Sequence, residues 1–172
     1  MRKPLIALLA IMALSLTPVL SRAGLLDEKA PEFTLTGLGN RPVSLSQYKG
    51  KVVFLDFWAS WCPPCKEELP ELNSFLKRYG SEDVVGIAVN IDKNGSNATD
   101  FLSSLPALSP NLIVLLDPDS KVISSYKARA MPTSYIIDRE GVIRHVHFGY
   151  TSSDPEKWEK EIGGLLKKED GQ

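Results

Sequence analysis

The chain has 172 residues and a nearly balanced charge, with 20 basic and 21 acidic residues. This balance leaves no charged footprint for nucleic acid or for an anionic membrane surface, so neither is expected as a partner. The sequence holds only two cysteines, whereas a secreted domain that is stabilised by disulfides carries several pairs.

The first residues have the features of a secretory signal peptide. Basic residues precede an uncharged apolar stretch over residues 5–20, and the small residues in Ser21–Ala23 suit cleavage before Gly24. We predict a signal peptide over residues 1–23, with an uncleaved membrane anchor as the alternative. Either would place the folded part outside the cytoplasm, in the periplasm or an equivalent compartment. The remaining residues 24–172 are enough for one domain, which we expect to be a monomer.

Two short strands open this domain. Phe33–Leu35 and Pro42–Leu45 flank the turn residues Gly37–Asn40, a pattern typical of a β-hairpin. Lys51–Trp58 is a nearly continuous apolar run, which indicates a strand covered on both faces. One ionisable residue, Asp56, interrupts the apolar run, and a charge in a buried strand needs a partner or a function.

The run Trp61–Cys65, with the letters WCPPC, follows this strand and places both cysteines at the start of a predicted helix. A helix N-terminus offers unpaired N–H groups and a partial positive charge, which favour a thiolate on Cys62. Cys65 can close a disulfide onto Cys62, and because such a short loop stabilises little, we interpret the pair as a redox centre. The alternative is half of a zinc site, which needs four ligands and has only His145 and His147 as further candidates.

The helix that begins at Pro63 is predicted to extend to Tyr79, with Gly80 as its end signal and a kink at Pro70. Its apolar residues recur at helical spacing. They are Leu69, Leu72, Phe75, Leu76 and Tyr79. Its three glutamates are expected to be solvated, near the positive end of the helix dipole. They are Glu67, Glu68 and Glu71.

The second half of the chain alternates strands and helices, the order that builds a parallel sheet. The expected strands are Val84–Ile91, Leu112–Leu116, Ser134–Ile137 and Val142–Phe148, of which the last two form a hairpin. The expected helices are Thr99–Leu105, Ser120–Tyr126 and one that begins at Asp154, with Pro155 in its first turn. His145 and His147 share one strand face, where we expect exposed side chains rather than a metal site.

Together these residues resemble the thioredoxin fold and, within it, the secreted TlpA/ResA-type thiol–disulfide oxidoreductases. The resemblance rests on APEFTL at residues 30–35, on residues 43–72 with FWASWCPPC, and on MPTSYIID at residues 131–138. A lone CxxC is a weak signal, but FWASW before it and the distant Met-Pro-Thr make it specific. The resemblance implies an α/β, thioredoxin-like fold with an N-terminal β-hairpin and a central α/β insertion, which we place in residues 92–116.

The resemblance also implies that the Met131–Pro132 bond is cis and brings Pro132 against the two sulfurs, so that the Met131 backbone can hold an extended substrate segment. A trans proline that opens the strand is the alternative, since only about 5–6% of X-Pro bonds in folded proteins are cis. The residues expected to contact the substrate are Trp61, Pro63, Pro64, Met131 and Thr133.

Sulfur chemistry then suggests the mechanism. The Cys62 thiolate attacks a substrate disulfide, and Cys65 resolves the mixed disulfide. Thioredoxin carries an aspartate at the position that matches Asp56, so the resemblance implies that Asp56 accepts the proton of Cys65. Many TlpA/ResA-type chains differ there, and an aspartate satisfied by local hydrogen bonds is the alternative. The family also has an acidic residue after the second core strand, for which Asp92 is the nearest candidate.

Pro63 and Pro64 bear on the direction of the reaction, because neither has an N–H group that could stabilise the thiolate. A less stabilised thiolate indicates a reducing couple. We therefore expect reduction of protein disulfides, with apocytochrome c as the substrate that the resemblance suggests and a membrane thiol donor of the DsbD/CcdA type. No cofactor is expected beyond the Cys62–Cys65 disulfide. The alternatives are a general periplasmic disulfide reductase, a thiol peroxidase, and a carrier of metal or haem.

Overall fold

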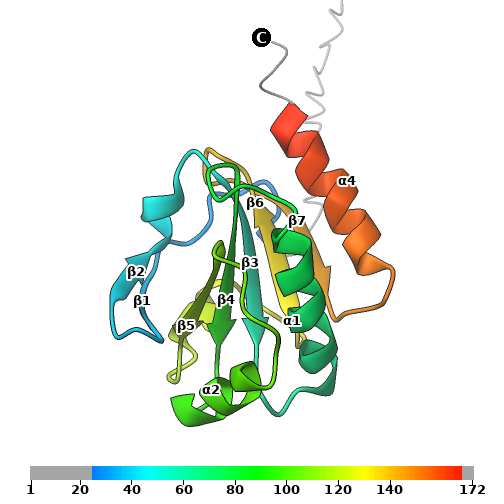
Figure 1. Cartoon of the computed structure of the whole chain (residues 1–172). Coiled ribbons are helices and arrows are strands. Elements are labelled where there is room, and N and C mark those ends of the chain that lie inside the picture. Colours follow the sequence, from blue (N-terminus) through cyan, green and yellow to red (C-terminus); the bar gives the residue numbers. More distant parts are fainter. Residues whose placement is uncertain (1–24, 168–172) are drawn as a thin grey trace, which may run out of the picture.

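A mixed sheet of seven strands, in the order β2-β1-β5-β4-β3-β6-β7, organises the computed structural model, which describes residues 25–167 (Figure 1). The predicted signal peptide lies outside the described residues. The strands are β1 Thr34–Gly37, β2 Pro42–Ser44, β3 Val52–Trp58, β4 Val84–Asn90, β5 Leu112–Leu116, β6 Thr133–Ile137 and β7 Ile143–Phe148. The helices are α1 Pro63–Leu76, α2 Gly95–Ser103, α3 Lys121–Ser125 and α4 Asp154–Lys167, with a 3-10 turn η1 at Leu45–Tyr48.

The central strands β3 and β4 pair in parallel, and every residue of both is buried. This burial explains why their sequences are continuous apolar runs rather than alternating ones. β3 pairs on its other side with β6, antiparallel. The strand that leads into the cysteines is therefore held on both sides and covered on both faces.

Helices cover both faces of the sheet. Phe54 and Trp58 of β3 pack with α1, α2 and α4 on one face, whereas Leu55 and Phe57 pack toward α3 and η1 on the other. Figure 1 shows α1 and α4 lying over the same side of the sheet, and the rings of Phe75 and Trp158 meet between them at 5.8 Å. The alternation of two apolar faces along one strand produces this layered α/β architecture.

The predicted insertion is present as α2 and β5, and it connects the N-terminal hairpin to the core. β5 pairs in parallel with β4 and antiparallel with β1, so the β1–β2 hairpin reaches the sheet only through β5. The thioredoxin-like fold with its N-terminal hairpin and central insertion is confirmed.

Two predicted helix ends differ from the structure, and one short element was not predicted. α2 begins at Gly95, earlier than predicted, because the Asn94 side chain accepts a hydrogen bond from the Ser96 N–H at 3.1 Å and caps the helix. α1 ends at Leu76 rather than at Tyr79, and the Asn111 amide donates to the carbonyls of both residues, at 3.2 and 3.4 Å. The turn η1 was not predicted. No helix within the described part of the chain is long and apolar enough to cross a membrane.

Candidate active site

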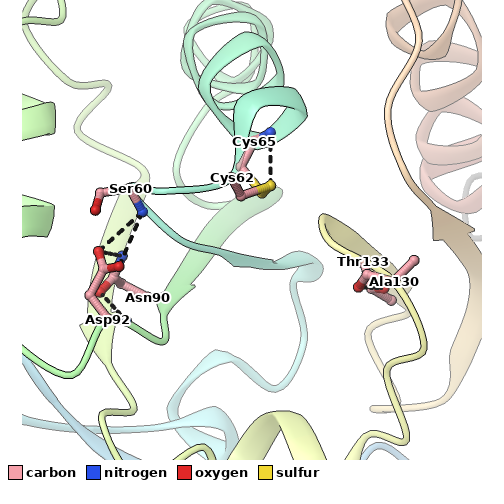
Figure 2. The surroundings of a disulfide bond; sticks show 7 residues. All are labelled: Ser60, Cys62, Cys65, Asn90, Asp92, Ala130 and Thr133. Carbon is pink, nitrogen blue, oxygen red and sulfur yellow. Dashed lines mark hydrogen bonds between the residues drawn. A yellow bond between two sulfur atoms is a disulfide. The ribbon is translucent and has the colours of Figure 1, made fainter.

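The two cysteines form a disulfide at the N-terminus of α1, with their Cα atoms 5.3 Å apart. Cys62 is the N-cap residue of the helix, and its Sγ accepts a hydrogen bond from the Cys65 N–H at 3.3 Å (Figure 2). Pro63 and Pro64 occupy the first two helical positions and are exposed. Because proline has no N–H, the first turn of α1 directs one main-chain donor at Cys62 rather than three.

The loop before the disulfide is held by Asp92. Both carboxylate oxygens of Asp92 accept from the Ser60 N–H, at 3.3 and 3.1 Å, and one of them accepts from the Asn90 side chain at 2.9 Å (Figure 2). Asp92 is 2% exposed, so these bonds are shielded from water. The acidic residue expected after the second core strand therefore fixes the loop that carries Trp61, whose side chain is 63% exposed beside Cys62.

The segment before β6 forms the other wall of the site. The Met131–Pro132 bond is cis, as the resemblance implied. The Thr133 hydroxyl donates to the Ala130 carbonyl at 2.7 Å, and the Gly149 N–H donates to the Pro132 carbonyl at 2.8 Å. In the view of Figure 2 this segment and the Ser60 loop lie on opposite sides of the disulfide. Neither main-chain group of Met131 makes a backbone hydrogen bond within residues 25–167.

A pair of carboxyl groups lies in the core beside this site. Asp56 on β3 is 0% exposed, and Glu68 on α1 is 1% exposed. The prediction that Glu68 is solvated is therefore wrong, while Glu67 and Glu71 are exposed as predicted. The alternative of an Asp56 satisfied by local hydrogen bonds is not supported, because among the described residues neither of its carboxyl oxygens has a partner at ordinary geometry.

Burial favours the protonated form of both carboxyl groups. Desolvation raises the pKa of Asp56 to about 7, although the nearby Glu68 carboxyl opposes the rise. Desolvation also raises the pKa of Glu68 to about 10, and the charges of Asp56 and Asp154 add to the shift. Glu68 is thus neutral at neutral pH, whereas Asp56 can gain or lose a proton there.

The sequence itself held a signal for Glu68. Residues three or four positions apart share one face of a helix, and Glu68 lies between Cys65 and Leu72 on that spacing. Both neighbours are fully buried, so the residue on the same face had to be buried too. The buried face of α1 therefore includes the polar Glu68 in addition to its apolar side chains.

Trp58 and the two histidines contact other side chains of the fold. Trp58 is fully buried and packs on Phe101, with ring centroids 5.6 Å apart. The histidines are less exposed than predicted, because Glu161 of α4 lies between them, 3.3 Å from His145 and 2.9 Å from His147. Among residues 25–167, no group of three or more His, Cys, Asp or Glu side chains is arranged to hold a metal ion.

Comparison with known proteins places this geometry in a family. A model of the Redoxin family matches residues 25–162. The thiol-disulfide oxidoreductase ResA of Bacillus thuringiensis (strain Al Hakam) is 32% identical over 143 residues, which is 83% of this chain and 78% of the relative.

Solved structures give the same result. A protein of Chlorobium tepidum assigned as thiol:disulfide interchange protein DsbE superposes with a TM-score of 0.74 at 38% identity, covering 80% of this chain and 95% of that one. The exposed lipoprotein thioredoxin Etrx1 of Streptococcus pneumoniae superposes with a TM-score of 0.65 at 31% identity, covering 78% of this chain and all of the other. The chain therefore belongs to the redoxin family, as a thiol–disulfide oxidoreductase of the TlpA/ResA type.

Proposed function

We propose that this oxidoreductase works as a reductase of protein disulfides outside the cytoplasm. The observation that carries the proposal is the donor set at Cys62, whose sulfur receives one main-chain N–H while two prolines remove the others. A disulfide-donating enzyme needs a strongly stabilised thiolate in its reduced form. The buried carboxyls of Asp56 and Glu68 add no positive charge that would compensate.

The reaction would proceed in two exchanges. The Cys62 thiolate attacks one sulfur of the substrate disulfide, and the other substrate sulfur leaves as a thiolate. Cys65 then loses its proton to Asp56 and attacks Cys62, which releases the second substrate thiolate and forms the Cys62–Cys65 disulfide. Two electrons pass from the enzyme to the substrate, and the protein needs no further cofactor for this step.

Substrate contacts are proposed for the groups that surround the disulfide. The Trp61 side chain and the two proline rings are exposed next to Cys62. The main chain at Met131 is available to pair with an extended segment, and Thr133 holds the turn that presents it. An extended peptide that contains a cystine fits such a surface better than a folded, buried disulfide does.

The finer assignment concerns substrate, donor and compartment. Apocytochrome c is the proposed substrate, and a membrane thiol carrier of the DsbD/CcdA type is the proposed donor. Support comes from the resemblance to ResA-type proteins and from the apolar N-terminal sequence. A similar protein is described as an exposed lipoprotein, in keeping with a periplasmic or otherwise extracytoplasmic location.

Two measurements test the proposal. The reduction potential of the Cys62–Cys65 couple should be well below that of glutathione, and a value far above it would reverse the direction. In cells, Cys65→Ala should trap substrates as mixed disulfides through Cys62, with the double variant Cys62→Ala/Cys65→Ala as the control. Capture of apocytochrome c supports the finer assignment, whereas capture of many unrelated proteins makes the enzyme a general reductase.

A further inference from the structure

A row of polar residues crosses the sheet from the buried Asp56 toward the surface. Asp56 of β3 pairs directly with Ser134 of β6, and Ser134 pairs with His147 of β7. Directly opposed residues of antiparallel strands project to the same face, with Cβ atoms about 4.5–5.5 Å apart. The three side chains therefore lie side by side on the face that α1 and α4 cover.

The links of the row are short. The Ser134 hydroxyl lies 3.3 Å from Nδ1 of His147. Nε2 of His147 lies 2.9 Å from a carboxylate oxygen of Glu161 on α4, a close contact whose angle departs from that of a hydrogen bond, so a small rotation of either side chain aligns the two groups. Burial decreases along the row, because Ser134 is 1% exposed while the Glu161 side chain is 22% exposed. Every position in the row holds a group that can both gain and pass on a proton.

An unpaired acceptor stands at the buried end. Neither oxygen of the Asp56 carboxyl has a hydrogen-bond partner at ordinary geometry within the described residues. The Ser134 hydroxyl is its cross-strand neighbour, and a hydroxyl can turn about its C–O bond to donate to one group while it accepts from another. Burying three polar side chains on this face costs more free energy than burying apolar ones, so the row needs a function.

We propose that Ser134, His147 and Glu161 form a proton-exchange route that connects the buried carboxyl of Asp56 with solvent. This inference rests on the proposed role of Asp56 as the proton acceptor of Cys65. The three residues touch neither the sulfurs nor the substrate, and they act through Asp56.

The proton balance of one turnover is simple. Cys65 gives its proton to Asp56 when it attacks Cys62, and the neutral Asp56 must lose that proton before it can accept another. The Asp56 proton passes to the Ser134 oxygen while the hydroxyl proton moves to Nδ1 of His147. His147 then gives its Nε2 proton to Glu161, which releases it to water. One proton leaves the core, and Asp56 is again a carboxylate. His147, now protonated at Nδ1, returns to its Nε2–H form by proton exchange with water before the next turnover.

A second exit would lead through Glu68, which faces Asp56 from α1 and lies in the field of Asp154 on α4. Glu68 holds its proton so firmly that it is a poor carrier at neutral pH, because burial and the two neighbouring aspartates keep it neutral. The His147 side is better suited, since an imidazole can take up a proton at one ring nitrogen and release one from the other. His147 itself faces Ser134 from β6, Glu161 from α4 and His145 along its own strand.

The test is a pH-jump single turnover of the full reduced protein. The protein is equilibrated near pH 6, where Asp56 holds its proton, and is then mixed to pH 8 with excess Ellman's reagent. The reagent releases one coloured thiolate when Cys62 attacks and a second when Cys65 resolves, and the second release requires that Asp56 first lose its proton. Ser134→Ala and His147→Gln should leave the first release unchanged and slow the second roughly 10-fold after the jump, because the Asp56 proton then leaves without its carriers. In both variants the slow release should speed up with the concentration of a small buffer such as imidazole, which replaces the lost carrier. His145→Gln, which contacts the same Glu161 but not Ser134, is the matched control.

The outcomes separate this inference from the proposed function. Unchanged second releases without buffer dependence in Ser134→Ala and His147→Gln overturn the route, as does equal slowing in His145→Gln. Asp56→Asn should slow the second release whether or not the route exists, so its slowing alone leaves the role of Asp56 standing. If Asp56→Asn has no effect, the role of Asp56 and the route are both rejected. Ser134→Ala removes one oxygen atom only, so it keeps the test valid if His147→Gln does not fold.

Discussion

Asp56 and Glu68 bury their carboxyl groups against each other, between the central strand and the helix that begins at the disulfide. In addition to burial, which raises both pKa values, the charge of Asp56 raises the pKa of Glu68, whereas the neutral Glu68 carboxyl lowers the pKa of Asp56. Two acids in one desolvated place cannot both ionise at low cost, so the pair stores protons that the unfolded chain would release near pH 4.

Asp56→Asn should therefore stabilise the oxidised protein at neutral pH. Folding raises the pKa of Asp56 to about 7, so the folded state binds this proton more tightly than the unfolded chain does. Stability then falls as the pH rises from about 4 to about 7, and the variant escapes this loss. We expect a gain of about 1–4 kcal/mol at pH 7, from about 1.4 kcal/mol per pKa unit, and little difference near pH 4. Urea unfolding of the variant and the unaltered protein at pH 4 and pH 7 measures this gain. An equal gain in the free energy of unfolding at both pH values would contradict the explanation.

Glu68→Gln should behave differently at higher pH. Because folding raises the pKa of Glu68 to about 10, the folded protein keeps this proton across the whole neutral range. The advantage of the variant over the unaltered protein should begin near the ordinary glutamate pKa and keep growing beyond pH 7, where the Asp56→Asn advantage levels off. Unfolding midpoints at pH 5, 7 and 9 decide this, and identical profiles for the two variants would show that the sites are not distinct.

Gly86→Ala should destabilise the fold by about 1–3 kcal/mol. A Cβ at Gly86 would clash with a methyl group of Leu76, on α1, and would lie 3.0 Å from one of Leu112, on β5. Leu76 is fully buried and has little room to move. Gly164→Ala is the control, since no atom outside its own stretch of helix backbone lies within 4 Å of the added Cβ and alanine favours a helix by about 1 kcal/mol. Thermal unfolding of both variants should give shifts of opposite sign.

Trp61→Ala should cost little stability but lower the rate of protein disulfide reduction. The side chain is 63% exposed, so its removal is expected to change the free energy of unfolding by less than about 0.5 kcal/mol. Exposed tryptophans at contact surfaces contribute strongly to binding, so kcat/KM with reduced enzyme and insulin should fall roughly 5- to 10-fold. The fall should be larger than that for a small disulfide. Equal losses for both would assign Trp61 to the cysteine chemistry rather than to docking.

The sequence predicted the sheet well because its signals are local. β3 and β4 are buried on both faces and appear as continuous apolar runs, and the disulfide position follows from the WCPPC run alone. The short turn η1 and the early start of α2 were missed, since one turn or one capping side chain leaves little periodicity to detect.

The site was predicted as a set of residues but not as an arrangement. Glu161 meets His147 only because α4 folds back over β7, and no spacing in the sequence reports that contact. Asp92 was named from family likeness, but its bond to the Ser60 N–H depends on how the ends of β3 and β4 come together. Side-chain partners that join distant elements require the folded chain.

The two ends of β7 have different neighbours. The Asp27 N–H donates to the Ile143 carbonyl at its start, at 2.8 Å, whereas the Gly149 N–H, just past its end, donates to the Pro132 carbonyl. Pro132 precedes Thr133, which pairs with Phe57 at the end of β3 that leads into the cysteines. A six-residue strand separates these points by roughly 16 Å. The described chain thus enters the domain at the end away from its sulfurs. A partner that docks on the disulfide therefore approaches the end of the sheet opposite to Asp27.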